Sequence, residues 1–423
     1  MKTKRFLYLC VAMSMTFFAC NKDDSSEEEK GTDSARTSEK TESIKGSDGE
    51  AAEPGVYDYS EEGGIIGGEN GGGTADTLGN KVKPGLLTAG EWNDLDNWGF
   101  WVKLLNNNNY YEMPKYWRHY PKSLVAVRLT DAGNNVVPNV RVTLLGDGKA
   151  EFSTKTDNAG LAYCWINLFD SAAIKAHYSL KIDDGFTVDS VKLTTKADTT
   201  LNINNIVLTS AKQSSATADV AFIVDATGSM IDEIDFLKAD LVDIISRANS
   251  QTGVELRTGA LFYRDVEDEY LTRADNFSTD VQKTQQFVAA QRADGGGDYP
   301  EAVHTALAAA LQNLSWNESA RARIAFLILD APAHHEEGVI KSLQNSISLF
   351  AQNGIKIIPV AASGADKETE FMLRFFDLAT GGTYVFLTDD SGIGGSHIEA
   401  SVGDYEVEAL ADIMVRLIEK YVK

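Results

Sequence analysis

The run Val220–Val224, with the sequence VAFIV, is followed directly by Asp225–Ser229, with the sequence DATGS. An unbroken apolar run of this length is typical of a strand that is buried on both faces, as in a parallel sheet. The turn after it places one carboxylate and two hydroxyls at the carboxyl end of the strand, where open α/β sheets bind ligands. Hard oxygen donors of this kind suit a small divalent cation such as Mg²⁺.

Further apolar runs of the same kind alternate with helical patterns through the rest of the chain. The runs are Thr258–Tyr263, Ile324–Leu329, Ile355–Ala361 and Thr383–Leu387. Apolar residues recur every three or four positions from Met230, over residues 301–314 and over about 405–421, which predicts helices there. This alternation predicts a doubly wound, mainly parallel α/β sheet over residues 217–423.

Carboxylates near the ends of later strands and loops are candidates to complete a cation site. Asp298 and Glu301 lie in one segment with the sequence DYPE, and Asp330 directly follows a predicted strand. Together with Asp225, Thr227 and Ser229 they offer carboxylate and hydroxyl oxygens from three separate parts of the chain. We therefore predict a metal site formed by these residues.

Residues 217–423 resemble a von Willebrand factor type A (VWA) domain with a metal-ion-dependent adhesion site. That family's first loop is D-x-S-x-S, which matches Asp225, Thr227 and Ser229 with threonine in place of the middle serine, and its fourth-strand aspartate matches Asp330. The resemblance implies a Rossmann-like fold and a bound cation, Mg²⁺ with Ca²⁺ or Mn²⁺ as alternatives. It also implies a protein ligand that contributes a carboxylate to the cation.

The middle loop differs from the commonest pattern of that family, which has a threonine after a glycine pair. The segment from Asp298 to Glu301 is similar instead to the D-x-P-E segment of integrin β-type A domains. That similarity implies Glu301 as the direct ligand, while Asp298 either replaces the threonine or serves a second ion. Asp232 and Glu233 match an adjacent acidic pair in the same domains, and this similarity implies that they are candidates to hold a second ion. The alternative is that they serve only the helix, because acids are favoured in the first turn of a helix by its dipole.

An enzyme is the main alternative to a binding protein. A metal-dependent hydrolase would use the same cation with His334 or His335 as general base. No Ser/His/Asp arrangement, nucleophile elbow or phosphate-binding G-x-x-x-x-G-K-[ST] loop is evident in the sequence. We expect a binding protein and not an enzyme, with a structural surface protein as a third possibility.

The beginning of the chain has the features of an export signal. Residues 1–19 carry a basic start and an apolar stretch, as in a signal peptide. The run before Cys20 resembles the lipobox of bacterial lipoproteins, and the lysine and acids after it resemble the surface-export signal of Bacteroidetes. We expect Cys20 to carry a lipid anchor in the outer membrane, with the protein at the cell surface. Residues 20–85, rich in acids and glycine, are expected to be a disordered tether.

Two further segments precede the predicted α/β domain. Residues 86–120 carry four of the chain's six tryptophans and are expected to pack on the domain that follows. Residues 121–210 contain short alternating runs and turns, which predict a small antiparallel β-sandwich. This segment loosely resembles immunoglobulin-like or carboxypeptidase-regulatory-like modules.

The composition of the chain argues against disulfide bonds as a source of stability and against nucleic acid as a partner. The chain contains 3 cysteines, one inside the predicted signal and one at the predicted lipid site, so no disulfide framework is expected. The formal net charge of −23 disfavours nucleic acid as a partner.

Overall fold

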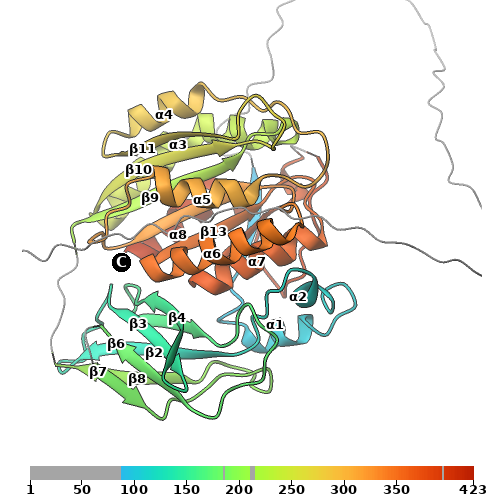
Figure 1. Ribbon diagram of the computed structural model, residues 1–423. Coiled ribbons are helices and arrows are strands. Elements are labelled where there is room, and N and C mark those ends of the chain that lie inside the picture. The colour runs from blue at the N-terminus through green and yellow to red at the C-terminus, as the bar shows by residue number, and fades with distance from the viewer. Residues whose placement is uncertain (1–86, 184–185, 210–214, 393–394) are drawn as a thin grey trace, which may run out of the picture. The chain divides into compact units, whose positions relative to one another are not determined.

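The computed structural model of the 423-residue chain describes residues 87–183, 186–209, 215–392 and 395–423 (Figure 1). The predicted signal peptide (1–19), the lipid site Cys20 and the tether (20–85) lie outside these residues. In the part of the chain that is described, no helix is long and apolar enough to cross a membrane.

An eight-stranded sheet forms the centre of the region that contains the predicted cation loop. Its strand order is β11-β10-β9-β12-β13-β14-β1-β15. Five neighbouring strands pair in parallel, in the order β10-β9-β12-β13-β14. The strands β11 and β1 run antiparallel to their neighbours. The predicted doubly wound α/β fold is confirmed. The strands are β9 (Thr217–Asp225), β10 (Glu255–Tyr263), β11 (Thr272–Ser278), β12 (Arg323–Leu329), β13 (Ile355–Ala361), β14 (Tyr384–Leu387), β1 (Thr88–Trp92) and β15 (Glu408–Ala409).

Helices cover both faces of this sheet, because successive side chains of each strand point to opposite sides. In β9, Val220 and Phe222 belong to one buried cluster, whereas Ala221 and Ile223 belong to the other. The first cluster includes α3 (Ile231–Thr252), α4 (Val281–Ala289) and α8 (Leu410–Val422). The second includes α5 (Val303–Asn313), α6 (Glu337–Asn353) and α7 (Lys367–Thr380), which lie together in Figure 1.

The last helix is shorter than predicted. It was expected from about residue 405, but α8 begins at Leu410. Tyr405 and Val407 are 44% and 42% exposed and precede the short strand β15, so they are not part of the helix's buried stripe.

The tryptophan-rich segment of residues 87–120, which we call the aromatic segment, contacts more of the molecule than we expected. Its first residues form β1, which pairs with β14 and β15 and so belongs to the sheet of residues 217–423. The segment continues through α1 (Trp98–Leu104) and α2 (Met113–Tyr116). Trp98 donates to the Thr195 carbonyl (3.0 Å), whereas Trp101 and Tyr110 pack on Phe371 of α7. These large rings are therefore buried against residues 121–210, on which we expected them to pack, and also against the sheet and helices of residues 217–423.

Residues 124–208 form two small sheets that share a buried core. One has the order β5-β2-β8 and the other β4-β3-β6-β7. All pairings are antiparallel except that of β2 with β8, which is parallel. The strands are β2 (Leu124–Asp131), β3 (Arg141–Gly146), β4 (Lys149–Lys155), β5 (Leu161–Trp165), β6 (Tyr178–Ile182), β7 (Phe186–Asp189) and β8 (Ile203–Leu208). We call this region the sandwich.

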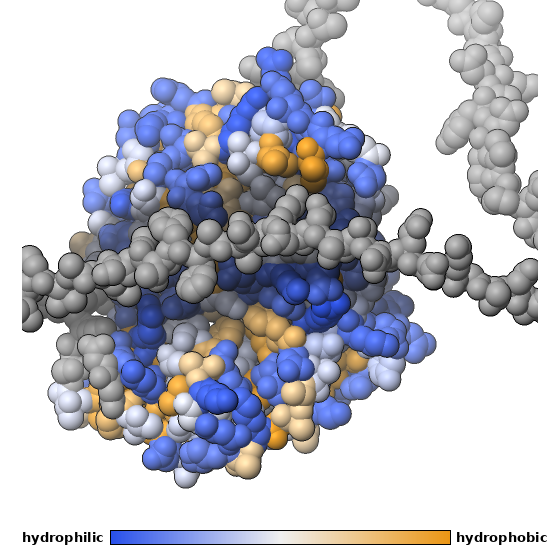
Figure 2. Space-filling model, viewed as in Figure 1, coloured by the Kyte–Doolittle hydropathy of each residue, from blue (hydrophilic) through white to orange (hydrophobic). Residues whose placement is uncertain are grey.

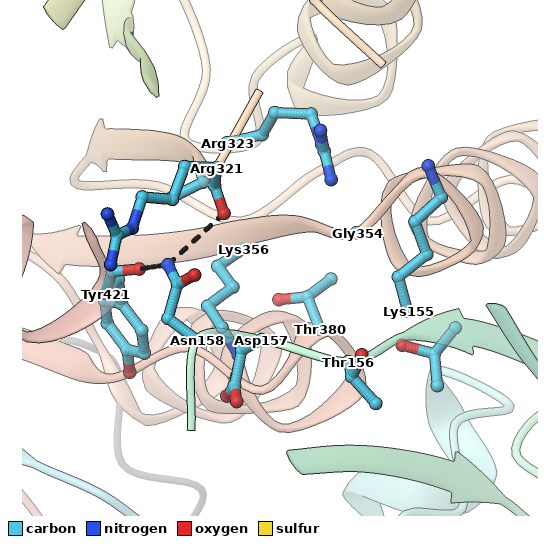
Figure 3. Close-up of a pocket in the computed structure, with 12 residues that line it drawn as sticks. Lys155, Thr156, Asp157, Asn158, Arg321, Arg323, Gly354, Lys356, Thr380 and Tyr421 are labelled. Atoms are coloured by element: carbon cyan, nitrogen blue, oxygen red, sulfur yellow. Dashed lines mark hydrogen bonds and ion pairs between the residues drawn. The ribbon is translucent and has the colours of Figure 1, made fainter. Parts of the chain in front are cut away.

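A polar seam joins the sandwich to the end of α8 (Figure 3). The side-chain amide of Asn158, on the loop between β4 and β5, donates to the carbonyls of Tyr421 (2.7 Å) and Arg321 (3.2 Å). Beside it, Lys356 pairs with Asp157 (3.2 Å). The cavity here has a volume of about 20 Å³, room for a single water molecule. The seam is thus a structural contact and not a ligand pocket.

The described surface is mostly hydrophilic in the view of Figure 2, and hydrophobic residues gather in small areas. Small scattered areas of this kind are normal for a folded domain.

Candidate cation-binding site

The loop after β9 holds its carboxylate in a fixed position. Asp225 is the last residue of the strand and is fully buried. Its Oδ1 accepts hydrogen bonds from the backbone N–H and the hydroxyl of Thr227, both at 2.8 Å. Its Oδ2 has no partner at normal hydrogen-bond distance among the described residues, while the buried Tyr263 hydroxyl interacts with the same carboxylate and partly offsets the rise that burial causes in the pKa of Asp225. The chain then enters the short 3₁₀ turn Gly228–Met230, which leads into α3.

Glu301 reaches the same place from the glycine-rich loop, residues 294–301 with the sequence DGGGDYPE. Its backbone N–H donates to the Pro332 carbonyl (2.9 Å), which ties this loop to the segment after β12. Gly296 has a φ of +75°, and a Cβ added there would lie 3.3 Å from Glu301 Oε1 and 3.4 Å from Thr227 Cβ. Glycine therefore allows both the backbone turn and the close approach. Glu301 is buried, and its Oε2 has no partner within the described part of the chain.

Asp330 completes a group of three buried carboxylates. It directly follows β12, which lies next to β9 in the sheet, so the two strand ends meet at one edge. Burial raises the pKa of Asp330, and a hydrogen bond with the Ser229 side chain partly offsets this rise. The structure thus brings Asp225, Thr227, Ser229, Glu301 and Asp330 together.

The electrostatics of this group show an excess of negative charge. Burial, followed by the charge of Asp330, raises the pKa of Asp225 to about 7. Burial, followed by the charges of Asp225 and Asp265, raises the pKa of Glu301 to about 9. These carboxyls therefore favour bound protons when no other positive charge is present. A divalent cation would supply that charge.

Asp298 lies outside the group of buried carboxylates. Its side chain is exposed and lines an open cavity of about 440 Å³ beside the glycine-rich loop. The cavity lining comprises Asp265, Val266, Glu267, Asp268, Gly296, Gly297, Asp298 and His334. Of the two acids that the sequence left open, the structure places Glu301, and not Asp298, next to Asp225 and Asp330.

The two acids at the start of α3, Asp232 and Glu233, lie in different environments. Glu233 is buried, and its Oε1 accepts from the backbone N–H (3.1 Å) and the hydroxyl (2.9 Å) of Ser363. Asp232 is half-buried one position earlier. The two carboxylates therefore have different surroundings, although they are adjacent in the sequence.

The two histidines considered for catalysis have other contacts. His334 Nε2 lies 2.7 Å from Asp265 Oδ1. His335 stacks on Tyr116 with ring centroids 3.5 Å apart, and its Nε2 lies 2.9 Å from the Tyr116 carbonyl. His335 thus packs against the aromatic segment.

The sequence analysis missed a Ser/His/Asp arrangement that the fold brings together. Ser363 Oγ lies 3.0 Å from His397 Nε2, and His397 Nδ1 lies 2.7 Å from Asp389 Oδ1. No local motif could have revealed it, because these residues come from two loops with no characteristic spacing.

This arrangement lacks the features of an acyl-transfer site. The Ser363 hydroxyl donates to Glu233, and the backbone N–H groups of residues 363, 364 and 365 bond to Glu233, Ser396 and Ala362. No donor of this loop is left to stabilise an oxyanion.

A cation at the candidate site would need hydroxyl and water ligands as well as carboxylates. Within the described ranges, no three His, Cys, Asp or Glu side chains form a group that could hold a metal ion by themselves. The unpartnered oxygens of Asp225 and Glu301, together with the hydroxyls of Thr227 and Ser229, fit the hard-donor preference of Mg²⁺.

Residues 219–374 match the sequence model of the von Willebrand factor A domain. This part of the chain is a von Willebrand factor A domain. The match contains the loop after β9, the glycine-rich loop and Asp330. The A domain is, at the general level, a protein-interaction or adhesion type of module.

Known proteins resemble parts of the chain. It is 29% identical over 263 residues to alpha-protein kinase vwkA of Dictyostelium discoideum. The matched region covers 56% of this chain and 41% of that protein. The chain spans less than half the length of the curated relatives it matches.

Among solved structures, von Willebrand factor type A from Catenulispora acidiphila matches with a TM-score of 0.33 and 13% identity, over 72% of this chain and 50% of that one. The pilus adhesin SpaC from Lactobacillus rhamnosus GG matches with a TM-score of 0.36 and 11% identity, over 50% of this chain and 31% of that one.

Proposed function

We propose that the A domain binds a protein ligand through a divalent cation held by Asp225, Thr227, Ser229, Glu301 and Asp330. The observation that carries this proposal is the pair of buried carboxylate oxygens, on Asp225 and Glu301, that have no hydrogen-bond partner in the described part of the chain. Leaving buried carboxylates unpaired is costly unless a cation or a proton compensates them.

The chemistry of Mg²⁺ favours ligand capture over a closed structural site. Mg²⁺ takes six oxygens in near-octahedral geometry and keeps several waters. Carboxylates and hydroxyls of the A domain would fill part of this shell, so a carboxylate from a protein partner can replace a water. Ca²⁺ and Mn²⁺ are alternatives for the same oxygen donors.

The surface around the site offers contacts to a protein. The open cavity of about 440 Å³ adjoins the glycine-rich loop. Val266 lines this cavity and is 58% exposed, while Ile231, the first residue of α3, and Tyr299, next to Asp298, are 57% and 44% exposed. Apolar groups next to a polar centre are common in protein interfaces.

Hydrolysis with His334 or His335 as the base has less support. His335 is stacked on Tyr116, and His334 is paired with Asp265. Stacking on Tyr116 engages the ring of His335, whereas His334 lines the open cavity. We propose binding of a protein ligand, and hydrolysis with His334 as base is the alternative.

The proposal for the location of the protein rests on its first residues alone. We propose a lipid anchor on Cys20 in the outer membrane, with residues 20–85 as the tether that carries the sandwich and A domain at the cell surface. Mass spectrometry of the mature amino terminus tests this proposal. An unmodified residue other than Cys20 at that terminus would refute it.

Titration of the full chain with Mg²⁺ and with Mn²⁺ by calorimetry tests the cation site. We expect binding by the wild type, and loss of binding in Asp225→Ala and Glu301→Gln with an unchanged circular dichroism spectrum. Asp298→Asn is the matched control, because this exposed acid should leave binding close to the wild-type value. Undiminished Mn²⁺ binding by Asp225→Ala would contradict the proposal. Once a protein ligand is identified, EDTA should abolish its capture.

A further inference from the structure

The loop of residues 362–366, between β13 and α7, contacts several parts of the proposed cation site. The Tyr299 hydroxyl, from the glycine-rich loop, lies 3.3 Å from the Asp330 carbonyl and accepts from the Asp366 N–H (3.1 Å). A Cβ added at Gly364 would lie 4.0 Å from Asp330 Oδ2. This loop therefore lies directly beside one of the proposed ligands.

Ser363, on the same loop, orients a buried carboxylate. Both its backbone N–H and its hydroxyl donate to Oε1 of Glu233, while Oε2 of Glu233 has no partner among the residues that the structure describes. Burial raises the pKa of Glu233, and the charge of Asp330 contributes in the same direction. Glu233 is thus 2% exposed, held through one oxygen and within the field of the cation site.

His397 extends this contact to the segment between β14 and α8. The His397 side chain is 3% exposed, with Nε2 3.0 Å from Ser363 Oγ and Nδ1 2.7 Å from Asp389 Oδ1. The backbone N–H of His397 also donates to Asp389 (3.1 Å), and the Gly364 N–H donates to the Ser396 carbonyl (2.9 Å). A continuous series of hydrogen bonds therefore runs from the exposed Asp389 to the buried Glu233.

We propose that Ser363 and His397 are positioning residues of the cation site. Ser363 holds the buried Glu233 carboxylate, whose negative charge acts on the cation site, and His397 fixes the Ser363 hydroxyl that makes this contact. The inference rests on the proposed cation-dependent function. It adds residues to that function that neither touch the cation nor belong to its loop motif.

Side chains that orient a metal site from outside have a measurable effect on affinity. Their replacement commonly weakens metal binding by about 10- to 100-fold. If the hydrogen bonds served only to fasten two loops together, their removal would lower the stability of the fold and leave cation affinity unchanged.

Titration of the full chain with Mn²⁺, followed by electron paramagnetic resonance, separates these two roles. We expect Ser363→Ala and His397→Gln to weaken Mn²⁺ binding by about tenfold and to change the spectrum of the bound ion. Ser363→Thr keeps the hydroxyl and should bind close to the wild-type value. His177→Gln is the matched control, because His177 is an exposed sandwich residue 3.9 Å from Asp189.

The outcomes distinguish this inference from the function on which it rests. If the wild type binds no Mn²⁺, both the cation site and the inference fall. If the wild type binds Mn²⁺ but Ser363→Ala and His397→Gln bind it equally well, only the positioning role is overturned. If these variants do not fold, Asp389→Asn takes their place, since its side chain is 74% exposed. Weaker Mn²⁺ binding by that variant supports the proposal, and unchanged binding refutes it.

Discussion

At the scale of single residues, His119 is a buried polar group whose two ring nitrogens both lack compensation from the described residues. Its side chain is fully buried and stacks on Phe375 with ring centroids 3.8 Å apart. Neither ring nitrogen has a hydrogen-bond partner within the described residues. Burial lowers its pKa to about 3, so the folded protein holds a neutral imidazole at an energetic cost.

His119→Phe should therefore stabilise the protein, because it keeps the stacked ring and removes the unpaired polar atoms. We expect the free energy of unfolding to rise by about 1–2 kcal/mol. Urea denaturation at pH 7 measures this change, with the exposed His177→Phe as control. A lower stability of His119→Phe than of the wild type would show that a hidden contact supports the imidazole.

The same substitution should change the pH dependence of stability. Below pH 6.5 the unfolded chain binds a proton at His119, whereas the folded chain stays neutral until about pH 3. The unfolded state then binds more protons, so stability falls as the pH decreases from about 6.5 toward 3. Urea denaturation at pH 7 and at pH 5 measures this change. Between these two pH values the free energy of unfolding should fall less for His119→Phe than for the wild type.

At the scale of elements, the strand β1 is joined to the A domain by a buried ion pair. Arg374 of α7 is fully buried and makes two hydrogen bonds to Asp94, which follows β1. The same guanidinium also bonds Glu370 (3.2 Å) and lies over the Trp101 ring, 5.2 Å from its centroid. Removing Asp94 takes away the carboxylate that makes two of these bonds and leaves the buried guanidinium with Glu370 as its bonded carboxylate, a loss that is strongly destabilising in a buried ion pair.

Asp94→Ala should lower the free energy of unfolding by about 3–5 kcal/mol. The neighbouring Asp96→Ala is the matched control, because Asp96 is exposed and should change stability little. Chemical denaturation of both variants measures the difference. Equal effects of the two substitutions would show that the ion pair does not stabilise the fold.

At the scale of the whole molecule, the A domain depends on contacts from both segments that precede it, residues 87–120 and the sandwich. β1 pairs with β14, Trp101 and Tyr110 pack on Phe371, and Asn158 bonds the last turn of α8. These contacts join the aromatic segment, the sandwich and the A domain into one folded unit that spans residues 87–423, apart from the positions that are not described.

A chain of residues 217–423 alone should therefore be less stable than a chain of residues 76–423. We expect the longer chain to unfold in one cooperative transition, and the shorter one to melt at a lower temperature or to aggregate, because it exposes the edge of β14 and the surface of Phe371. Scanning calorimetry of the two chains measures this. Equal melting temperatures would show that the A domain is independent.

The A-domain fold and much of its cation loop could be predicted from the sequence because their signals are local. Apolar runs mark the strands, helical spacing marks α3, and the residues Asp225, Thr227 and Ser229 lie within one short turn. Asp330 could be added because neighbouring parallel strands end at the same edge of the sheet.

The sequence by itself thus determined the fold class and most of the candidate ligands. Only the tertiary structure decided that Glu301 and not Asp298 is buried within reach of the charges of Asp225 and Asp330, that β1 joins the sheet of a distant domain, and that His397 meets Ser363. These outcomes depend on which separate segments pack together, and such long-range contacts leave no periodic or spacing signal in the chain that forms them.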